Sequence, residues 1–351
     1  MGGERDRRDG GDRSLVRWAR ALLAGGVALG LAACGVERAL TSRVGNALAD
    51  GGAVYASDDA AELVGGASPF SLKLLEGLSR ESPRDRGLLL ALARGYTEYA
   101  YAYVEQPADF AAARAAGAGA RERARALYLR ARDYGLQGLE LARPGFGRRL
   151  AADPEHALGS LGRADVPLAF WTAAAWGAAV ALGRDDAELL GALPGVRLLA
   201  ARALELDERY DAGALELLNA SLSMTEPVPE PLRIARARQH LERALALSHG
   251  RLAAPYVVFA ESVSLPTGNR AEFDRLITAA LSVDPDALSE HRLANAAFRR
   301  RAYWLRARSD ELFGSQQTAL PQPPEDPRGA SLAAAGAPAA PRAAQRLGDI
   351  P

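Results

Sequence analysis

The chain has 351 residues, of which 43 are Lys or Arg, 43 are Asp or Glu, four are His and one is Cys. A formal net charge of zero argues against nucleic acid or another polyanion as the partner, and a single cysteine excludes a disulfide framework. Ala, Leu, Arg and Glu dominate the composition while isoleucine occurs only three times, which favours an all-α protein.

The first 33 residues have the pattern of a secretion signal. Three arginines precede an uncharged run over residues 21–33. This run is too short to cross about 30 Å of hydrocarbon as a stable helix, so it predicts a cleaved signal peptide. A buried N-terminal helix is the alternative interpretation.

The run ends in Leu31-Ala32-Ala33-Cys34, which resembles a bacterial lipobox. The resemblance implies that Cys34 is lipidated, becomes the first residue of the mature protein and anchors it to the membrane. Because this is the single cysteine, no thiol is left for catalysis or metal binding. Gly35, in place of Asp, favours the periplasmic side of the outer membrane over retention at the inner membrane.

The sequence predicts four segments. Residues 1–33 form the signal peptide, residues 34–50 a tether and residues 51–314 a helical domain. Residues 315–351 form a tail rich in Pro and Ala, which we expect to be disordered.

Proline positions indicate where helices of the domain begin. Residues 58–63 predict a short helix, and five later segments place Pro in a first helical turn, where it loses no helical hydrogen bond. These segments begin at Ser68-Pro69, Ser82-Pro83, Asp153-Pro154, Glu230-Pro231 and Asp284-Pro285.

Periodic apolar residues and a recurring pattern predict how the helices pack. Leu88, Leu92, Tyr96, Tyr99 and Tyr103 follow the spacing of one helical face. Residues 203–207, 244–248 and 280–284 share a closing pattern, at spacings close to those of a tetratricopeptide-type helix pair. The sequence therefore predicts stacked antiparallel helical hairpins, in the manner of a tetratricopeptide-like α-solenoid.

No motif for catalysis, metal binding or a cofactor stands out in the sequence. The four histidines lie in separate segments, and no thiol can join them at a metal. The chain has no Gly-x-Ser-x-Gly elbow, phosphate loop or dinucleotide-binding fingerprint. We therefore expect neither an enzyme nor a bound metal or cofactor.

Residues 165–180 are apolar on all sides, which predicts a central helix surrounded by other helices. Trp171 and Trp176 are five residues apart and project about 140° apart, so at most one of them faces a given cavity. A role for both as core anchors is the alternative to a role in ligand binding.

A cluster of tyrosines indicates either a core or the lining of an amphipathic groove, because a buried tyrosine must satisfy its hydroxyl. The cluster comprises Tyr96, Tyr99, Tyr101 and Tyr103. Asn295 is a polar residue on a predicted helix, where it either bonds a neighbouring backbone or faces a ligand. The candidate ligand-cleft residues are therefore Tyr96, Tyr99, Tyr103, Trp171, Trp176 and Asn295.

Seven stretches, taken in order, resemble the T-component lipoproteins of tripartite ATP-independent periplasmic (TRAP) transporters. They are residues 54–59, 69–76, 99–105, 126–134, 171–177, 237–245 and 292–295. The resemblance covers roughly residues 50–313. It implies a periplasmic, membrane-tethered stack of helical hairpins that binds the transporter's periplasmic substrate-binding protein, forms a homo-oligomer and handles a hydrophobic or acidic organic solute.

We therefore expect an accessory component of a solute uptake system, which binds the substrate-binding protein and an organic solute. A general scaffold lipoprotein for envelope protein assembly is the alternative, since concave helical-repeat surfaces commonly bind other proteins.

Overall fold

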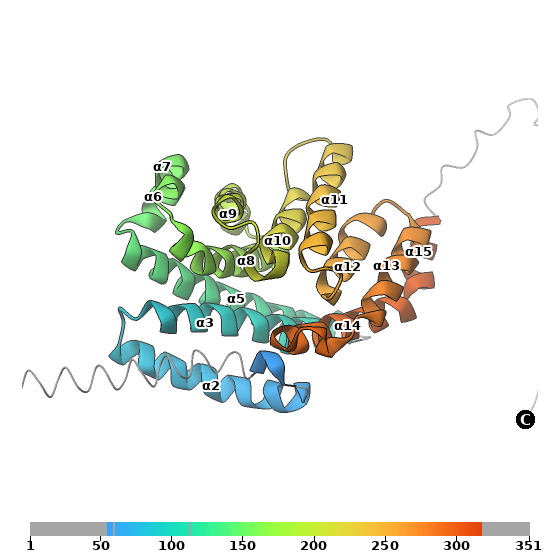
Figure 1. Cartoon of the computed structure of the whole chain (residues 1–351), viewed down its shortest axis with the longest axis horizontal. Helices are drawn as coiled ribbons and strands as arrows, with labels where there is room; N and C mark the ends of the chain where they lie inside the picture. The colour runs from blue at the N-terminus through green and yellow to red at the C-terminus, as the bar shows by residue number, and fades with distance from the viewer. Residues whose placement is uncertain (1–54, 59, 112–113, 318–351) are drawn as a thin grey trace, which may run out of the picture.

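The computed structural model of the protein describes residues 55–58, 60–111 and 114–317 (Figure 1). Every regular element in these ranges is a helix, so the predicted all-α class is confirmed. The signal peptide, Cys34, the tether and the tail beyond residue 317 lie outside the described residues. The last helix continues to Gln317, just past the predicted end of the domain.

The helices of the first half of the chain lead from the N-terminal hairpin to the central apolar helix. They are α2 (Ala61–Glu81), α3 (Arg86–Tyr99), the π-helix η1 (Ala100–Glu105), α4 (Gln106–Phe110), α5 (Arg114–Ala142), α6 (Phe146–Ala152), α7 (Pro154–Gly159), the short 3-10 helix η2 (Arg163–Asp165) and α8 (Val166–Leu182). Figure 1 shows α2, α3, α5 and α8 layered in this order, and each contacts the next.

The second half continues the stack. Its helices are α9 (Ala187–Leu206), the 3-10 helix η3 (Tyr210–Gly213), α10 (Ala214–Ser223), α11 (Glu230–Leu247), α12 (Ala253–Phe259), the π-helix η4 (Ala260–Ser264), α13 (Arg270–Ser282), the 3-10 helices η5 (Pro285–Ala287) and η6 (Ser289–His291), α14 (Arg292–Ala307) and α15 (Ser309–Gln317). Contacts between α8 and α9, α10 and α11, and α12 and α13 make three hairpins, which is consistent with the predicted stack.

The recurring closing pattern marks the end of the second helix in each of these hairpins. It falls at the C-terminal ends of α9, α11 and α13, where Ala203, Ala244 and Ala280 are fully buried. A small side chain at this point lets a neighbouring element of the fold approach the helix closely. Gly213, which has a positive φ of 95°, lies against Ala244, and a Cβ there would lie 3.3 Å from Ala244 Cα.

The apolar helix α8 is the centre of the fold, as its sequence predicts. It contacts α3, α5, α9 and α10. Residues 163–182 are long and apolar enough to span a membrane, yet 56% of the most apolar 18-residue window is buried inside the protein. Gly135 and Gly138 of α5 bring the two helices together, because a Cβ on Gly138 would lie 2.7 Å from a methyl carbon of Leu168.

Two of the predicted helix starts are wrong. Ser68-Pro69 does not open a helix but lies inside α2, which begins at Ala61. Pro69 costs the helix one hydrogen bond, whereas Val64, Leu72 and Leu75 on either side of it are buried, so packing outweighs the loss.

The Ser82-Pro83 prediction fails for a different reason. These residues form a turn, and α3 begins only at Arg86 because the Asp85 carboxylate accepts hydrogen bonds from the amides of Gly87 (2.9 Å) and Leu88 (3.2 Å). The prediction at Asp153-Pro154 is confirmed, since Asp153 caps α7 and Pro154 is its first residue.

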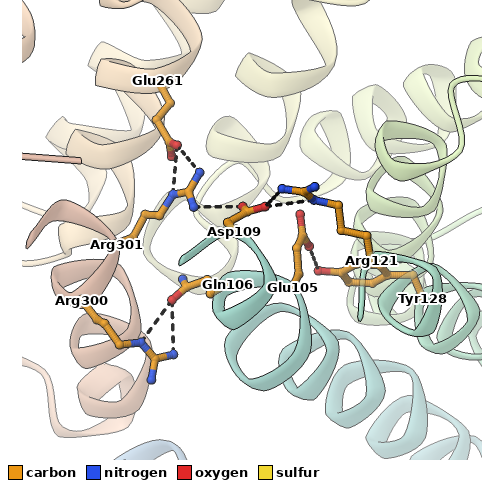
Figure 2. A network of polar contacts seen from close by, with 8 residues as sticks. All are labelled: Glu105, Gln106, Asp109, Arg121, Tyr128, Glu261, Arg300 and Arg301. Carbon is orange, nitrogen blue, oxygen red and sulfur yellow. Dashed lines mark hydrogen bonds and ion pairs between the residues drawn. The ribbon is translucent and has the colours of Figure 1, made fainter. Parts of the chain in front are cut away.

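The end of the stack returns to its beginning. Arg292 of α14 donates a hydrogen bond to the carbonyl of Ser57 (3.1 Å), and Arg300 donates one to the carbonyl of Ala102 in η1 (2.6 Å). Arg301 forms ion pairs with Asp109 of α4 (2.9 Å) and with Glu261 of η4 (2.6 Å), as Figure 2 shows. The last helices therefore contact the segment before α2, η1 and α4, near the beginning of the stack.

Candidate functional site

A cavity of about 600 Å³ lies inside this arrangement. Its walls come from α2, α3, η1, α8, η3, α10, η6 and α14, with Ala56 and Val258 at its margins. Most of the lining is apolar, and its largest aliphatic members are Val64, Leu72, Leu75, Leu217, Leu218 and Leu293. Small-molecule sites are typically concave, apolar and supplied with a few polar groups, so this cavity is the candidate site.

Aromatic residues form one wall of the cavity. Tyr99 and Tyr103 stack with their ring centroids 5.8 Å apart, and the Tyr103 hydroxyl donates a hydrogen bond to the Ala61 carbonyl (2.9 Å). The Tyr101 ring lies 5.3 Å from that of Phe298, and burial raises the pKa of the Tyr101 hydroxyl. This wall joins the N-terminal hairpin to α14.

Three of the six predicted cleft residues line the cavity, namely Tyr99, Tyr103 and Trp171. Trp176 lies on another side of α8, where the guanidinium of Arg132 is 5.4 Å from its ring centroid. The structure thus agrees with the expectation that at most one of the two tryptophans faces the cavity. A ligand role for any of the six remains a prediction.

Tyr96 and Asn295 make contacts within the protein instead. The Tyr96 hydroxyl donates a hydrogen bond to Glu76 Oε1 (2.8 Å), and its ring stacks on that of Tyr134. Asn295 accepts a hydrogen bond from the Ala253 amide (2.9 Å) and donates one to the Arg251 carbonyl (3.2 Å). Of the two roles predicted for Asn295, bonding to a neighbouring backbone or facing a ligand, the structure shows the first.

The π-helix η1 changes the direction of the tyrosine side chains that follow Tyr99. The spacing of the sequence assumed one regular helical face from residue 88 to residue 103. The chain instead widens into a π-helix directly after Tyr99, which changes the direction of the later side chains. Tyr96, which precedes the π-helix on α3, is buried behind the cavity, whereas Tyr99 at the end of α3 and Tyr101 and Tyr103 of η1 line it.

One end of the cavity is polar, a feature that the sequence analysis missed. On α3, Arg94 Nε donates to Glu98 Oε1 (2.9 Å), and the Arg94 guanidinium lies 5.6 Å from the centroid of Trp171. His291 Nε2 of η6 lies 3.5 Å from Asp211 Oδ1 of η3. The four charged or titratable groups come from three distant elements, and no local spacing signals that they meet.

Glu98 and Asp211 expose their carboxylates to this end. Glu98 is solvent-accessible over 43% of its side chain and lines the cavity, and burial among the surrounding helices raises the pKa of its carboxyl although Arg94 opposes the rise. Asp211 is accessible over 41% of its side chain and has a φ of 47°. The left-handed backbone at Asp211 kinks η3 from within, and Asp tolerates this conformation better than most residues.

Within the described residues, no group of three or more His, Cys, Asp or Glu side chains is arranged to hold a metal ion. The cavity combines an apolar body, aromatic residues and a charged end, which are features of a ligand-binding site.

Fold and site together define a class of protein: an all-helical stack of hairpins that encloses an apolar cavity with a polar end. The model of the TRAP transporter T-component family matches residues 57–313. The chain belongs to this family, which is an accessory family of transporters and not a known class of enzyme. The protein is thus associated with a TRAP transport system at the cell envelope.

A relative in Treponema pallidum (strain Nichols), which carries the description "Uncharacterized protein", is 28% identical over 266 residues. The similarity covers 74% of this chain and 82% of the relative. The likeness therefore extends over most of the chain rather than over one short motif.

Proposed function

We propose that this protein is a lipid-anchored periplasmic component of a TRAP uptake system that holds an organic solute in its cavity and binds the system's substrate-binding protein. The cavity of about 600 Å³ is the observation that carries the proposal. Its size falls in the range of small-molecule sites, and its lining combines apolar walls with a few polar groups. Self-association of the chain, expected from the family, stays a prediction.

A fluorescent apolar probe tests solute binding. N-phenyl-1-naphthylamine, which is uncharged at pH 7, should gain fluorescence on adding the chain from Gly35 to Pro351, which contains every described residue. Ala294 lines the cavity with an exposed face, so Ala294→Trp should fill the space and abolish the gain. Ala271→Trp, at an exposed position of α13 outside the lining, is the matched control and should bind the probe normally.

Affinity capture from periplasmic extract tests the partner. With the same chain as bait, enrichment of one TRAP substrate-binding protein supports the proposal. Retention of envelope-assembly proteins alone would favour the scaffold alternative and contradict the transport role.

A further inference from the structure

The charges around the cavity are unbalanced, which bears on the kind of solute that the proposed function would involve. Among the described residues of the lining, Arg94 is the only Arg or Lys, whereas Glu98, Asp211 and Glu290 supply three carboxylates. His291 is the remaining titratable group besides the tyrosines. The polar end therefore has more negative than positive groups.

The single guanidinium is already engaged. Arg94 is ion-paired with Glu98 on the next turn of α3 and lies over the ring of Trp171. An anionic solute at the Nη atoms of Arg94 would place its charge near both Glu98 and Asp211. Like charges this close repel each other, which disfavours an anion at this end of the cavity.

Asp211 is held much less tightly. Its contact with His291 Nε2 is 3.5 Å long, beyond the length of a good charge-assisted hydrogen bond, and 41% of its side chain is accessible. A protonated amine between Asp211 and Glu98 would gain hydrogen bonds to carboxylates without breaking the Arg94 pair.

The rest of the lining fits the same kind of molecule. Tyr99, Tyr103 and Phe298 are aromatic members of the lining, and aromatic rings attract cations. Leucines of α2 and α10 supply the surface for an apolar chain. From this juxtaposition we propose that the solute is an amphipathic organic cation, with an alkyl or aryl body in the apolar part and a protonated amine at Asp211 and Glu98. The inference rests on the proposed function, and it departs from the acidic solute that the family resemblance implies.

Three ligands that share a chain and differ in charge test it. Decylamine, decanol and decanoate are titrated at pH 7, below their micelle concentrations, against the bound N-phenyl-1-naphthylamine. We expect decylamine to bind about ten-fold tighter than decanoate, because one charge-assisted hydrogen bond contributes about that factor. Decanol should fall between them.

Two variants locate the amine. Asp211→Asn removes the charge while Asn still tolerates the left-handed backbone. This variant should weaken the binding of decylamine about ten-fold and leave the binding of decanol unchanged. Glu98→Gln should act in the same direction, and Asp185→Asn, on an exposed residue outside the lining, should change neither ligand.

The outcomes separate the two proposals. Displacement by all three ligands with decanoate as tight as decylamine, or tighter, overturns the cation while solute binding stands. Equal weakening of decylamine and decanol by Asp211→Asn also overturns it, because the loss would then be structural. If neither the probe nor any ligand binds, solute binding itself is wrong.

Discussion

Arg301 and Asp109, which are 192 residues apart in the sequence, lie 2.9 Å apart as an ion pair. The same guanidinium also bonds Glu261, so one side chain of α14 bridges the segment after η1 and the π-helix η4 (Figure 2). Asp109 is held from its other side by Arg121 (2.7 Å). The wall of the cavity thus depends on a polar junction between the two ends of the stack.

Removal of this bridge should destabilise the protein. Arg301 is mostly buried, and Arg301→Gln leaves Glu261 without this partner, so we expect a loss of about 2 kcal/mol in the free energy of unfolding. Urea denaturation followed by circular dichroism measures it. Arg163→Gln removes an arginine whose side chain is 77% exposed and should change the free energy by less than about 0.5 kcal/mol. An equal effect of both variants would contradict a special role for Arg301.

The close contact between α5 and α8 predicts how glycine substitutions change stability. A Cβ on Gly135 would overlap Thr172 Oγ1 and lie 3.0 Å from Thr172 Cβ, so Gly135→Ala should cost about 1–3 kcal/mol. Gly191 of α9 has open space around it, and Gly191→Ala should stabilise the helix by up to about 1 kcal/mol. Thermal unfolding of the two variants should therefore shift in opposite directions. A stable Gly135→Ala protein would mean that α8 can move away from α5.

Glu272 supplies a prediction about pH. Two hydrogen bonds from Arg238 (2.7 and 3.1 Å) lower the pKa of the Glu272 carboxyl, although its burial acts in the opposite direction. The Ser264 hydroxyl donates a third hydrogen bond, which also lowers this pKa. A carboxyl with a lowered pKa stabilises the folded state above its ordinary pKa of 4.5, and this contribution is lost as the pH falls. Glu272→Gln should cost about 2 kcal/mol at pH 7.

The cost of Glu272→Gln should shrink as the pH falls below 4.5, because the carboxyl is then protonated in the unfolded chain and, at lower pH, in the folded protein too. Urea denaturation at a series of pH values measures the difference. Glu81→Gln, at an exposed position, should lie within about 0.5 kcal/mol of wild type at pH 7. A cost for Glu272→Gln that is the same at pH 3 and pH 7 would show that the charge does not matter.

Lipidation of Cys34 is tested by labelling cells with an alkyne-bearing fatty acid. The mature protein should carry the label, and its N-terminal peptide should begin at Cys34. Cys34→Ala should remove the label because no other cysteine is present. Label that persists in Cys34→Ala would rule out this anchor.

Local sequence patterns predicted helices, but they did not predict the contacts by which α14 joins the beginning of the stack. The apolar residues of 165–180 predicted a central helix, and Asp153-Pro154 predicted the start of α7, because both signals act within a turn or two. Pro69 misled because the packing of α2 outweighs one missing hydrogen bond. The π-helix η1 has no local signature, so residues 88–103 were predicted to form one regular helical face.

The candidate site was predicted only in its aromatic part. Tyr99, Tyr103 and Trp171 were identified because large aromatic side chains on amphipathic helices indicate either a core or a groove. Arg94 and Glu98 pair within α3, but this pair joins Asp211 and His291 only after three elements come together. Ordinary charged residues in Arg- and Glu-rich helices give no sign of such a meeting.

Helical hairpin stacks usually have contacts only between neighbours, so they can fold from any point and unravel one repeat at a time. The bonds from Arg300 to η1 and from Arg301 to α4 join parts of the chain that are more than 190 residues apart. We therefore expect a single cooperative transition, in which fraying of α14 and loss of the first hairpin occur together. A chain emerging into the envelope would accordingly complete its cavity only after its last helices have arrived.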